Sequence, residues 1–497
     1  MNRSGPEFSE NIKHGAIAAS HGPNYGRSPN RLLSPLLASV LSVFSVVNLL
    51  PSAQAQDLGI KAAPQKEPIT IINATIHPIS DAVIQQGWLT MVRGRIMAMG
   101  MGAPAMKVEG ATIDAKGLHV YPGLIAPETQ LGLAEMASVR ASNDFNEVGD
   151  VTPETRAAVA VNPDSTLLPV TRSNGVLIAA VVPNGGRISG RVSVMKLDGW
   201  TWEDMTIKAD AGLAISWPQA RPISAWWMDR PDSEQLDDIR KGLAAVDDVF
   251  KSAEAYRLTR KADAAAPIDL RLEAMQGVLP PAGGNGTPDP AAAAKNPQLP
   301  VFITAQDVDQ ITSAVTWAND RKLKMVLVGG RDAALCADLL KRHNIPVIIE
   351  GTHAMPKRAD SPYDDAFTLP ATLKAAGVRF CIASADRNAH ERNLPYNAST
   401  AVAYGLSPDE AIRSITLSAA EILGVAAGAD GVGSLQATKA ATLIITDGDP
   451  LEITTHVLRA FIDGREIDLS NKQTKLAEKY RAKYEQKKAD GQTKAGK

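Results

Sequence analysis

Residues 121–132 read YPGLIAPETQLG, and the pattern of the chain changes at this stretch. Before it, short β-type segments are separated by glycines, as in a small antiparallel sheet. After it, apolar runs alternate with helical segments nearly to residue 425, which is typical of strand–helix repeats. We therefore predict that this stretch contains the first strand of a barrel. Glu128 and Gln130 would then lie at its C-terminal end, where barrels carry their catalytic groups.

The composition is that of a globular protein with more than one domain. The chain has 497 residues, of which 44% are hydrophobic and 21% are charged. Its formal net charge of -2 gives no reason to expect nucleic acid, and the oligomeric state is left open. Cys336 and Cys381 fall in apolar segments and are predicted to be buried free thiols.

Residues 1–55 have the features of an export leader. Arg27 and Arg31 precede an apolar run, and Ala53 and Ala55 fit the small-residue cleavage pattern. The alternative is a membrane anchor, but the run barely reaches spanning length and contains a proline. We predict cleavage after Ala55, which leaves an exported, periplasmic protein without a stable membrane span.

The mature chain divides into a barrel and a smaller β domain. Residues 66–120 and residues 428–470 both hold short strand-like runs with glycine turns, and we predict that they form one β-sandwich. Residues 121–427 are predicted to form a distorted (β/α)8 TIM-type barrel, because their strands are continuously apolar, as in a parallel sheet buried on both faces. Residues 280–300 are a Pro/Gly/Ala-rich linker loop, and residues 471–497 are a Lys-rich tail, either a solvated helix or a frayed end.

The motifs around the barrel resemble those of the amidohydrolase superfamily. The likeness runs from about residue 69 to about residue 470 and rests on DAKG before YPGLI, on LSAAEILGV, and on VGSLQATKAATLIITDGDPLE. The nearest groups are the imidazolonepropionase-like and dihydroorotase-like members, and the chain looks like an exported subgroup of the former. The resemblance implies a distorted TIM barrel with a small β-sandwich. It also implies hydrolysis of C–N bonds in a small-molecule substrate at a divalent-metal centre, usually zinc.

The positions that hold this metal in the superfamily carry other residues here. The superfamily usually has Asp-x-His-x-His after PGLI, whereas this chain has Ala126, Glu128 and Gln130 at those three ligand positions. The histidine positions of strands 5 and 6 fall on Thr304 and Gly329. The resemblance therefore implies a degenerate set of metal ligands.

The distribution of histidines leads to the same expectation without any alignment. The chain has 8 histidines, and none lies between His119 and His343. Only His353 and His390 fall near the predicted ends of strands 7 and 8. Two histidines on adjacent late strands cannot build a His-rich dinuclear zinc site, and carboxylates could complete it only in an unusual geometry. We therefore assign no metal ligand.

Two residues are the candidates for acid/base catalysis. The strand-8 aspartate position of the superfamily falls on Ala385 or, one residue on, Asp386; the resemblance implies that this aspartate takes a proton from the attacking water. His353 lies in a charged loop just past strand 7 and can act as an acid or base. The predicted substrate contacts are Glu128, Gln130, Thr304, Arg358 and Arg387.

Each of these assignments has a structural alternative. Glu128 and Gln130 share one face of an extended segment and can bind an amine or amide, or can be a polar pair satisfied by their neighbours. His353 can be an ordinary surface residue of a long loop. Asp386 can pair with Arg387 or Arg392, and such cations lower a carboxyl pKa and make it a poor base.

Two functions remain open at this point. The first is hydrolysis of amide or cyclic amide bonds with an atypical or absent metal centre. The second is a catalytically inactive barrel that acts as a periplasmic binding or scaffold protein, because a fold does not by itself carry a function.

Overall fold

The structure is a computed structural model, in which Ala55–Lys497 form one compact unit. It describes residues 57, 59–104, 109–136, 138–225, 227–281, 297–384 and 388–495. The predicted leader and most of the predicted linker loop lie outside these ranges. Within them, no helix has both the length and the apolar character that a membrane span requires.

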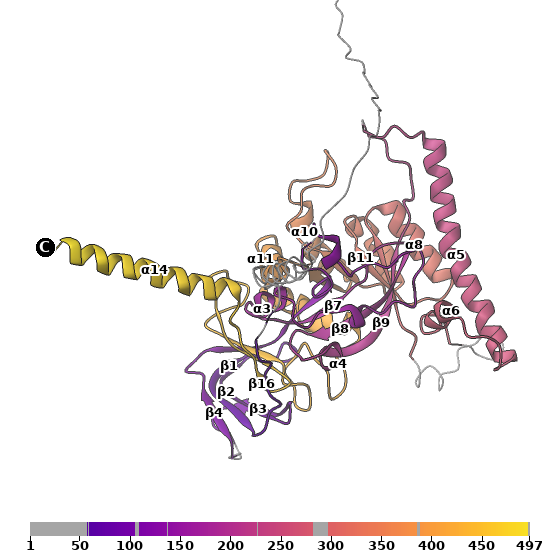
Figure 1. The fold of residues 1–497 in the computed structure, drawn as a ribbon. Helices are drawn as coiled ribbons and strands as arrows, with labels where there is room; N and C mark the ends of the chain where they lie inside the picture. Colours follow the sequence, from indigo (N-terminus) through magenta and orange to yellow (C-terminus); the bar gives the residue numbers. More distant parts are fainter. Residues whose placement is uncertain are drawn as a thin grey trace, which may run out of the picture. The chain divides into compact units, whose positions relative to one another are not determined.

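Two segments far apart in the sequence, residues 69–122 and residues 443–466, contribute strands to one sheet (Figure 1). Its strands are β1 (Ile69–Ile76), β2 (Ile84–Val92), β3 (Arg95–Met101), β4 (Ala111–Asp114), β5 (His119–Pro122), β14 (Leu443–Thr446), β15 (Val457–Ile462) and β16 (Arg465–Glu466). Their order is β16-β15-β14-β5-β1-β2-β3, with β4 paired to β1. The two halves meet where β14 runs antiparallel to β5 and Ile444 faces Tyr121. Residues 66–120 and 428–470 therefore share a sheet, while their closure into a sandwich stays a prediction.

The second sheet is the barrel. Its strands are β6 (Leu124–Thr129), β7 (Val176–Val181), β8 (Ile188–Lys196), β9 (Thr206–Ser216), β10 (Val301–Ala305), β11 (Met325–Gly329), β12 (Val347–Glu350) and β13 (Phe380–Ala383). They follow one another in chain order, and β13 also lies against β6, so the sheet is nearly closed. The predicted α/β barrel is confirmed, and its first strand falls within the stretch YPGLIAPETQLG.

One strand departs from the predicted parallel arrangement. The strands from β9 to β13 are parallel, as expected from their apolar runs, but β8 is antiparallel to both β7 and β9. The reason is the short connection 182–187, in which Gly185 and Gly186 adopt positive φ angles of 101° and 68°. A parallel crossover needs about a dozen residues or more, so this turn can only return the chain antiparallel.

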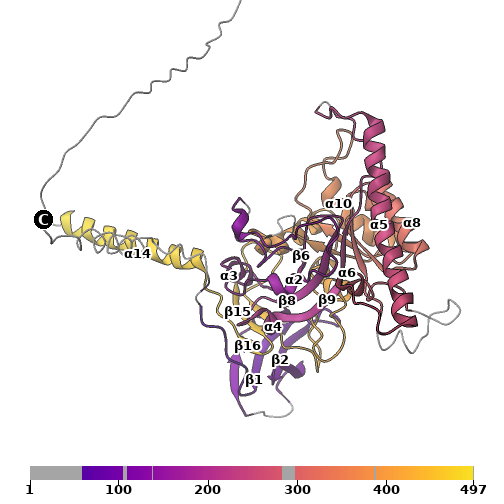
Figure 2. The same ribbon diagram turned by 45° about the vertical axis from the view of Figure 1, so that its right-hand side comes forward.

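Helices cover the outside of the later barrel strands (Figures 1 and 2). They are α8 (Val308–Asp320), α9 (Ala337–Arg342), α10 (Asp365–Ala376), α11 (Leu394–Ala403), α12 (Pro408–Ser414) and α13 (Leu417–Leu423). The long helix α5 (Asp232–Ala262) packs on α8, where the Phe250 ring meets the edge of Trp317 at 4.8 Å and Asp247 pairs with Arg321.

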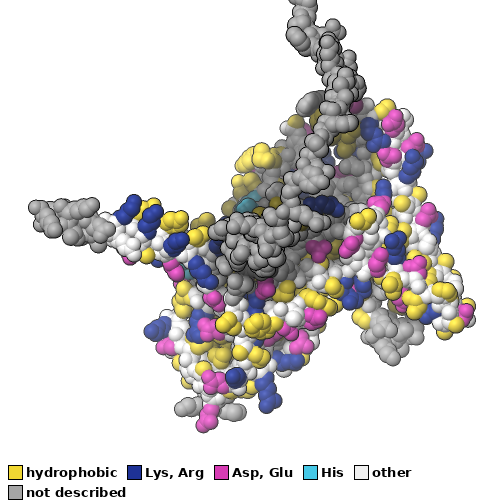
Figure 3. All heavy atoms as spheres, in the orientation of Figure 1, with side chains coloured by type: hydrophobic (Ala, Val, Ile, Leu, Met, Phe, Trp, Pro, Cys, Tyr) yellow, Lys and Arg dark blue, Asp and Glu magenta, His cyan; other side chains and the backbone are white. Residues whose placement is uncertain are grey.

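The remaining helices are short or peripheral. They are η1 (Arg140–Ser142), α2 (Ala157–Ala160), α3 (Leu167–Arg172), α4 (Trp202–Met205), α6 (Leu270–Ala274), η3 (Ala333–Cys336), η4 (Glu391–Asn393) and α14 (Lys472–Ala495). The side chains of α14 from residue 472 to residue 488 are exposed, so the tail is a solvated helix there. Acidic and basic side chains are interspersed over the face shown in Figure 3, in keeping with the small net charge.

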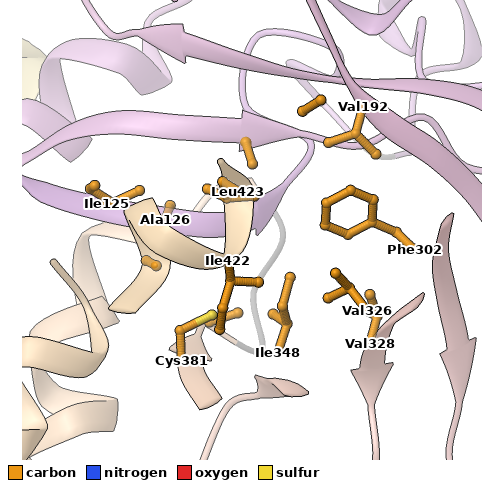
Figure 4. Close-up of a cluster of buried hydrophobic side chains, with 14 of the residues drawn as sticks. Ile125, Ala126, Val192, Phe302, Val326, Val328, Ile348, Cys381, Ile422 and Leu423 are labelled. Atoms are coloured by element: carbon orange, nitrogen blue, oxygen red, sulfur yellow. The ribbon is translucent and has the colours of Figure 1, made fainter. Parts of the chain in front are cut away.

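The barrel interior is packed with apolar side chains, which come from β6, β8, β10, β11, β12 and β13 and from the end of α13 (Figure 4). Cys381 is completely buried among them, and Cys336 is also buried; both are free thiols, as predicted. The residues labelled in Figure 4 are Ile125, Ala126, Val192, Phe302, Val326, Val328, Ile348, Cys381, Ile422 and Leu423. On β11 to β13, Val328 pairs with Ile348 and Ile348 pairs with Cys381, so these residues share one face of the sheet, which faces the cluster.

A buried ion network links the barrel to the first sheet. Asp198, just after β8, accepts a hydrogen bond from Arg172 Nη1 of α3 at 2.7 Å and one from Arg465 Nη1 of β16 at 3.1 Å. Arg172 also donates to the carbonyl oxygen of Leu197 at 3.0 Å. Three elements far apart in sequence are therefore held by one carboxylate.

Two histidines and a tyrosine stack on the first sheet. His77 Nε2 lies 3.0 Å from His119 Nδ1, and the His77 ring stacks on Tyr121 with 4.0 Å between centroids. Burial and the nearby His119 lower the pKa of His77 from 6.5 to about 4. The folded protein therefore holds this imidazole neutral over a range in which the unfolded chain would protonate it.

This pKa shift predicts a loss of stability in mild acid. The unfolded chain takes up a proton at His77 near pH 6.5, and the folded protein does so only near pH 4. The stability that the neutral ring contributes is thus complete above pH 6.5 and is lost as the pH falls toward 4. In urea unfolding experiments between pH 6.5 and pH 4, the free energy of unfolding should decline less for His77→Phe, which keeps the ring stack, than for the wild type. Equal declines in the two proteins would contradict this account.

Candidate functional site

The end of β6 brings a carboxylate into the barrel mouth. Pro127 has no N–H to donate, and the pairing of β6 with β7 is interrupted between Ala126 and Thr129. Glu128 lies within this irregularity and is only 4% exposed. Burial and the charge of Glu128 both raise the pKa of the Cys381 thiol, which lies in the apolar cluster of the barrel.

A second carboxylate comes from the end of β12. Ile348 points into the apolar cluster, so Glu350, two residues further along the same strand, follows it on the inward face at the mouth (Figure 4). Gln306, which follows β10, donates a hydrogen bond from Nε2 to Glu350 Oε2 at 2.8 Å. This bond spans the intervening strand β11 and fixes the orientation of the carboxylate.

Gly329 makes that bond sterically possible. It is the last residue of β11 and has a positive φ of 89°, which favours glycine. A Cβ atom at this position would stand 2.3 Å from Gln306 Nε2. The place where the superfamily resemblance expects a strand-6 histidine is therefore occupied by the amide of Gln306.

The two carboxylates lie on strands that flank β13. Ile348 pairs with Cys381 and Glu350 pairs with Ala383, so β13 follows β12 in the sheet and then lies against β6. Glu128 on β6 and Glu350 on β12 thus approach the mouth from either side of β13. Burial and the charge of Glu128 both raise the pKa of Cys381, which keeps it a thiol at neutral pH.

His353 lies at the rim of the mouth, in the loop that follows β12. It is exposed, and its Nε2 lies 2.7 Å from Thr400 Oγ1 on α11. The loop beneath it is held by the buried Asn397, whose Oδ1 accepts hydrogen bonds from the backbone N–H groups of Thr352 at 2.9 Å and His353 at 3.4 Å. The structure therefore puts His353 close to the site but gives its ring a partner on α11.

Arg358 is engaged by a buried aspartate. Asp332, which follows β11, accepts hydrogen bonds from both Arg358 and Lys357, the latter at 3.1 Å. Burial raises the pKa of Asp332, but the hydrogen bonds and charges of Arg358 and Lys357 outweigh it and leave the pKa below its usual value. In this structure Arg358 anchors the loop after β12 to the end of β11.

The remaining predicted site residues fall as follows. Thr304 lies two residues after Phe302 on β10, so the two side chains are on the same, inward face of the strand. Gln130 is almost fully buried just beyond β6. Asp386 and Arg387 lie outside the described residues, so their roles stay predictions.

The donor atoms do not fit the His-rich dinuclear zinc centre that the resemblance implies. Among the residues that the structure describes, no group of three His, Cys, Asp or Glu is placed to hold a metal ion. Among the described residues near the mouth, Glu128 and Glu350 supply carboxylates, Asp332 is paired with Arg358 and Lys357, Gln306 is an amide, and Cys381 remains protonated. We therefore derive no chemistry from a metal at this site.

Glu350 and Gln306 were not among the residues predicted from the sequence. For Glu350 there was a signal: it is the polar end of the apolar run PVIIE, two residues after Ile348 and on the same face. The sequence held no such signal for Gln306. This residue lies just after β10, and its hydrogen bond to Glu350 depends on the space left by Gly329 on β11.

Comparisons with known proteins agree with this architecture. Residues 308–472, from the start of α8 to the start of α14, match the Amidohydrolase family. No curated protein matches the chain. The fold resembles the crystal structure of an amidohydrolase from Thermotoga maritima MSB8, with a TM-score of 0.67 and 22% identity, over 80% of this chain and 99% of that one. Looser matches include N-isopropylammelide isopropylaminohydrolase from Burkholderia multivorans ATCC 17616, at a TM-score of 0.42 and 14% identity over 81% of this chain and 98% of that one.

Proposed function

Starting from a chain whose residues 308–472 match the Amidohydrolase family, we propose that this protein is an exported hydrolase of amide or cyclic amide C–N bonds. Its barrel mouth would use the carboxylates Glu128 and Glu350 in place of a zinc pair. The observation that carries the proposal is the 2.8 Å hydrogen bond from Gln306 to Glu350, made over Gly329. It orients a carboxylate at the end of a barrel strand, which is where enzymes of this architecture place their catalytic groups.

In this proposal each of the two carboxyl groups carries out one of the two proton transfers. Glu350, held by Gln306, takes a proton from water as the water oxygen bonds to the amide carbon. Glu128, in its protonated form, gives a proton to the nitrogen as the C–N bond breaks, which yields a carboxylic acid and an amine. Such general acid–base pairs typically accelerate a reaction by about 10²–10⁴-fold for each group.

Glu350 suits the role of base on strand 7 better than His353 does. The Glu350 side chain follows Ile348 on the inward face, whereas His353 is exposed and its Nε2 contacts Thr400. Asp386 remains a second candidate for the same proton transfer because it follows β13, the strand between the two glutamates. Thr304 and Gln130 would contact the substrate from β10 and β6.

The proposal is tested by hydrolysis in the presence and absence of a chelator. Purified protein would be incubated with N-acyl amino acids and with cyclic amides such as dihydropyrimidines and hydantoins, and product amine or acid would be measured alongside metal content. We expect turnover of at least one class that persists after chelation, because the carboxylates do not depend on a metal. Stoichiometric zinc together with complete loss of activity on chelation would contradict the assignment.

A second candidate is a catalytically inactive barrel that serves as a periplasmic binding or scaffold protein. It is favoured by the residues at the usual ligand positions, Ala126, Gln130, Thr304 and Gly329, which supply no carboxylate, imidazole or thiolate. The same compounds distinguish the two functions. Saturable binding without turnover, measured by calorimetry, would support the inactive barrel.

A further inference from the structure

A cavity of about 500 Å³ lies at the end of the barrel opposite the mouth. Its walls include Pro300, Lys324, Pro346 and Arg379, each of which immediately precedes one of the strands from β10 to β13. Parallel strands begin at the same edge of a sheet, so this cavity is separated from Glu128 and Glu350 by the length of the barrel. Its volume falls within the range of small-molecule sites, about 300–1,000 Å³.

The polar lining of this cavity combines basic side chains with the amides Gln298, Asn319 and Asn344. Lys208, Lys324, His343 and Arg379 all line it, and the one carboxylate in the lining is Glu421. Glu421 is already taken by an outside partner, because both its carboxylate oxygens accept from Arg413 Nη2, at 2.9 and 3.1 Å. The cavity therefore carries an excess of positive charge.

These cations lack acidic partners of their own. Within the described ranges, Lys208, Lys324 and Arg379 form no ion pair, although ion pairs are frequent elsewhere in the chain, for example Arg358 with Asp332. Arg379 donates only a long hydrogen bond, 3.4 Å, to the carbonyl oxygen of Asn344. An anionic ligand in the cavity would thus not have to displace a carboxylate from any of the three.

Lys208 and Lys324 are close enough to repel one another. Burial lowers the pKa of Lys208, and the charge of Lys324 lowers it further. Two like charges beside one cavity form an unfavourable arrangement, which an anion between them would relieve.

Capping of α13 accounts for only part of this arrangement. Lys208 Nζ lies 3.4 Å from the carbonyl oxygens of Leu423 and Gly424, where a cation favours the end of a helix. That contact explains why one lysine lies there. It does not explain the approach of Lys324 or of Arg379, which come from the starts of two different strands.

We propose that this cavity binds a small organic anion, with its charged group between Lys208 and Lys324. The apolar part of the ligand would lie on Leu323, Ile345 and Leu423, which line the same cavity and are largely buried. The ligand class is then a phosphate ester or carboxylate that carries a compact apolar group. This site is independent of the proposed hydrolase function.

Phenyl phosphate is the probe that tests the site, with inorganic phosphate and phenol as its two halves. Calorimetry at constant ionic strength should show saturable binding of phenyl phosphate, weaker binding of inorganic phosphate and weakest binding of phenol. Lys324→Gln should weaken phenyl phosphate binding by about tenfold, because one charge-assisted hydrogen bond is lost. Lys324 is exposed, so this variant should fold normally, and Lys208→Gln should have at least as large an effect.

Lys261→Gln is the matched control. Lys261 is an exposed lysine on α5 that does not line the cavity, so its removal changes the net charge by the same amount. Affinity for phenyl phosphate should be unchanged in this variant. Absence of saturable binding, or equal affinity of Lys324→Gln and the wild type, would overturn the proposal, as would phenol binding as tightly as phenyl phosphate. Benzoate in place of phenyl phosphate then distinguishes a carboxylate ligand from a phosphate ester.

Discussion

Asp198→Ala is expected to lower the free energy of unfolding by about 3–5 kcal/mol, because it breaks a buried ion network by removing one partner. The Asp198 side chain is only 4% exposed, and the Arg172 side chain beside it only 5%. Both Arg172 and Arg465 donate hydrogen bonds to Asp198. Without this carboxylate, the largely buried Arg465 would lose its ion-pair partner, and Arg172 would keep only Asp57, at 3.7 Å.

Urea unfolding of the purified protein measures this effect directly. Asp430→Ala is the matched control, because Asp430 pairs with Arg95 at 2.8 Å but is 86% exposed. An exposed pair of this kind is worth about 0–1 kcal/mol. If Asp198→Ala were no more destabilising than Asp430→Ala, the network would not hold the barrel to the first sheet.

Glu350→Gln is expected to lower kcat by about 10²–10⁴-fold on any substrate that the protein hydrolyses, because an amide cannot accept the proton of the attacking water. The substitution preserves the volume of the side chain and its ability to accept a hydrogen bond from Gln306. Folding stability should therefore change little, and the loss should appear in kcat rather than in KM. Glu128→Gln should produce a loss of the same order.

The control for this experiment is Glu273→Gln on α6. Glu273 accepts a 2.7 Å hydrogen bond from the Tyr256 hydroxyl at the protein surface, and a glutamine oxygen can accept the same bond. The Glu273→Gln variant should have the same activity as the wild type. His353→Ala and Asp386→Asn complete the series. Full activity in Glu350→Gln together with none in Asp386→Asn would move the proton transfer to the residue after β13.

Much of the fold follows from local sequence patterns. The change at YPGLIAPETQLG locates the first barrel strand, because the glycine-punctuated segments before it and the apolar runs after it differ in their periodicity. The runs VFITA, MVLVG and FCIA predict β10, β11 and β13, since strands buried on both faces are continuously apolar. The direction of β8 did not follow from such a run, since direction depends on the connection and not on the strand's composition.

The candidate site was only partly accessible from the sequence. The resemblance located Glu128, Thr304 and Gly329 at strand ends and showed that they differ from the usual ligands. It could not show that the missing side chain of Gly329 makes room for Gln306, or that Gln306 reaches Glu350. Those relations depend on β10, β11 and β12 lying side by side. The spacing of Gln306, Gly329 and Glu350 along the chain does not indicate that these side chains meet.

The sequence alone therefore determined where the barrel begins, which runs form its strands, and that YPGLIAPETQLG lacks the histidines of a zinc pair. These are local properties, set by the side chains of each segment and by their alternation. Tertiary structure alone decided that Glu128 and Glu350 approach the mouth from either side of β13, and that basic residues gather at the opposite end. Those features arise from long-range packing, in which residues more than a hundred positions apart come into contact.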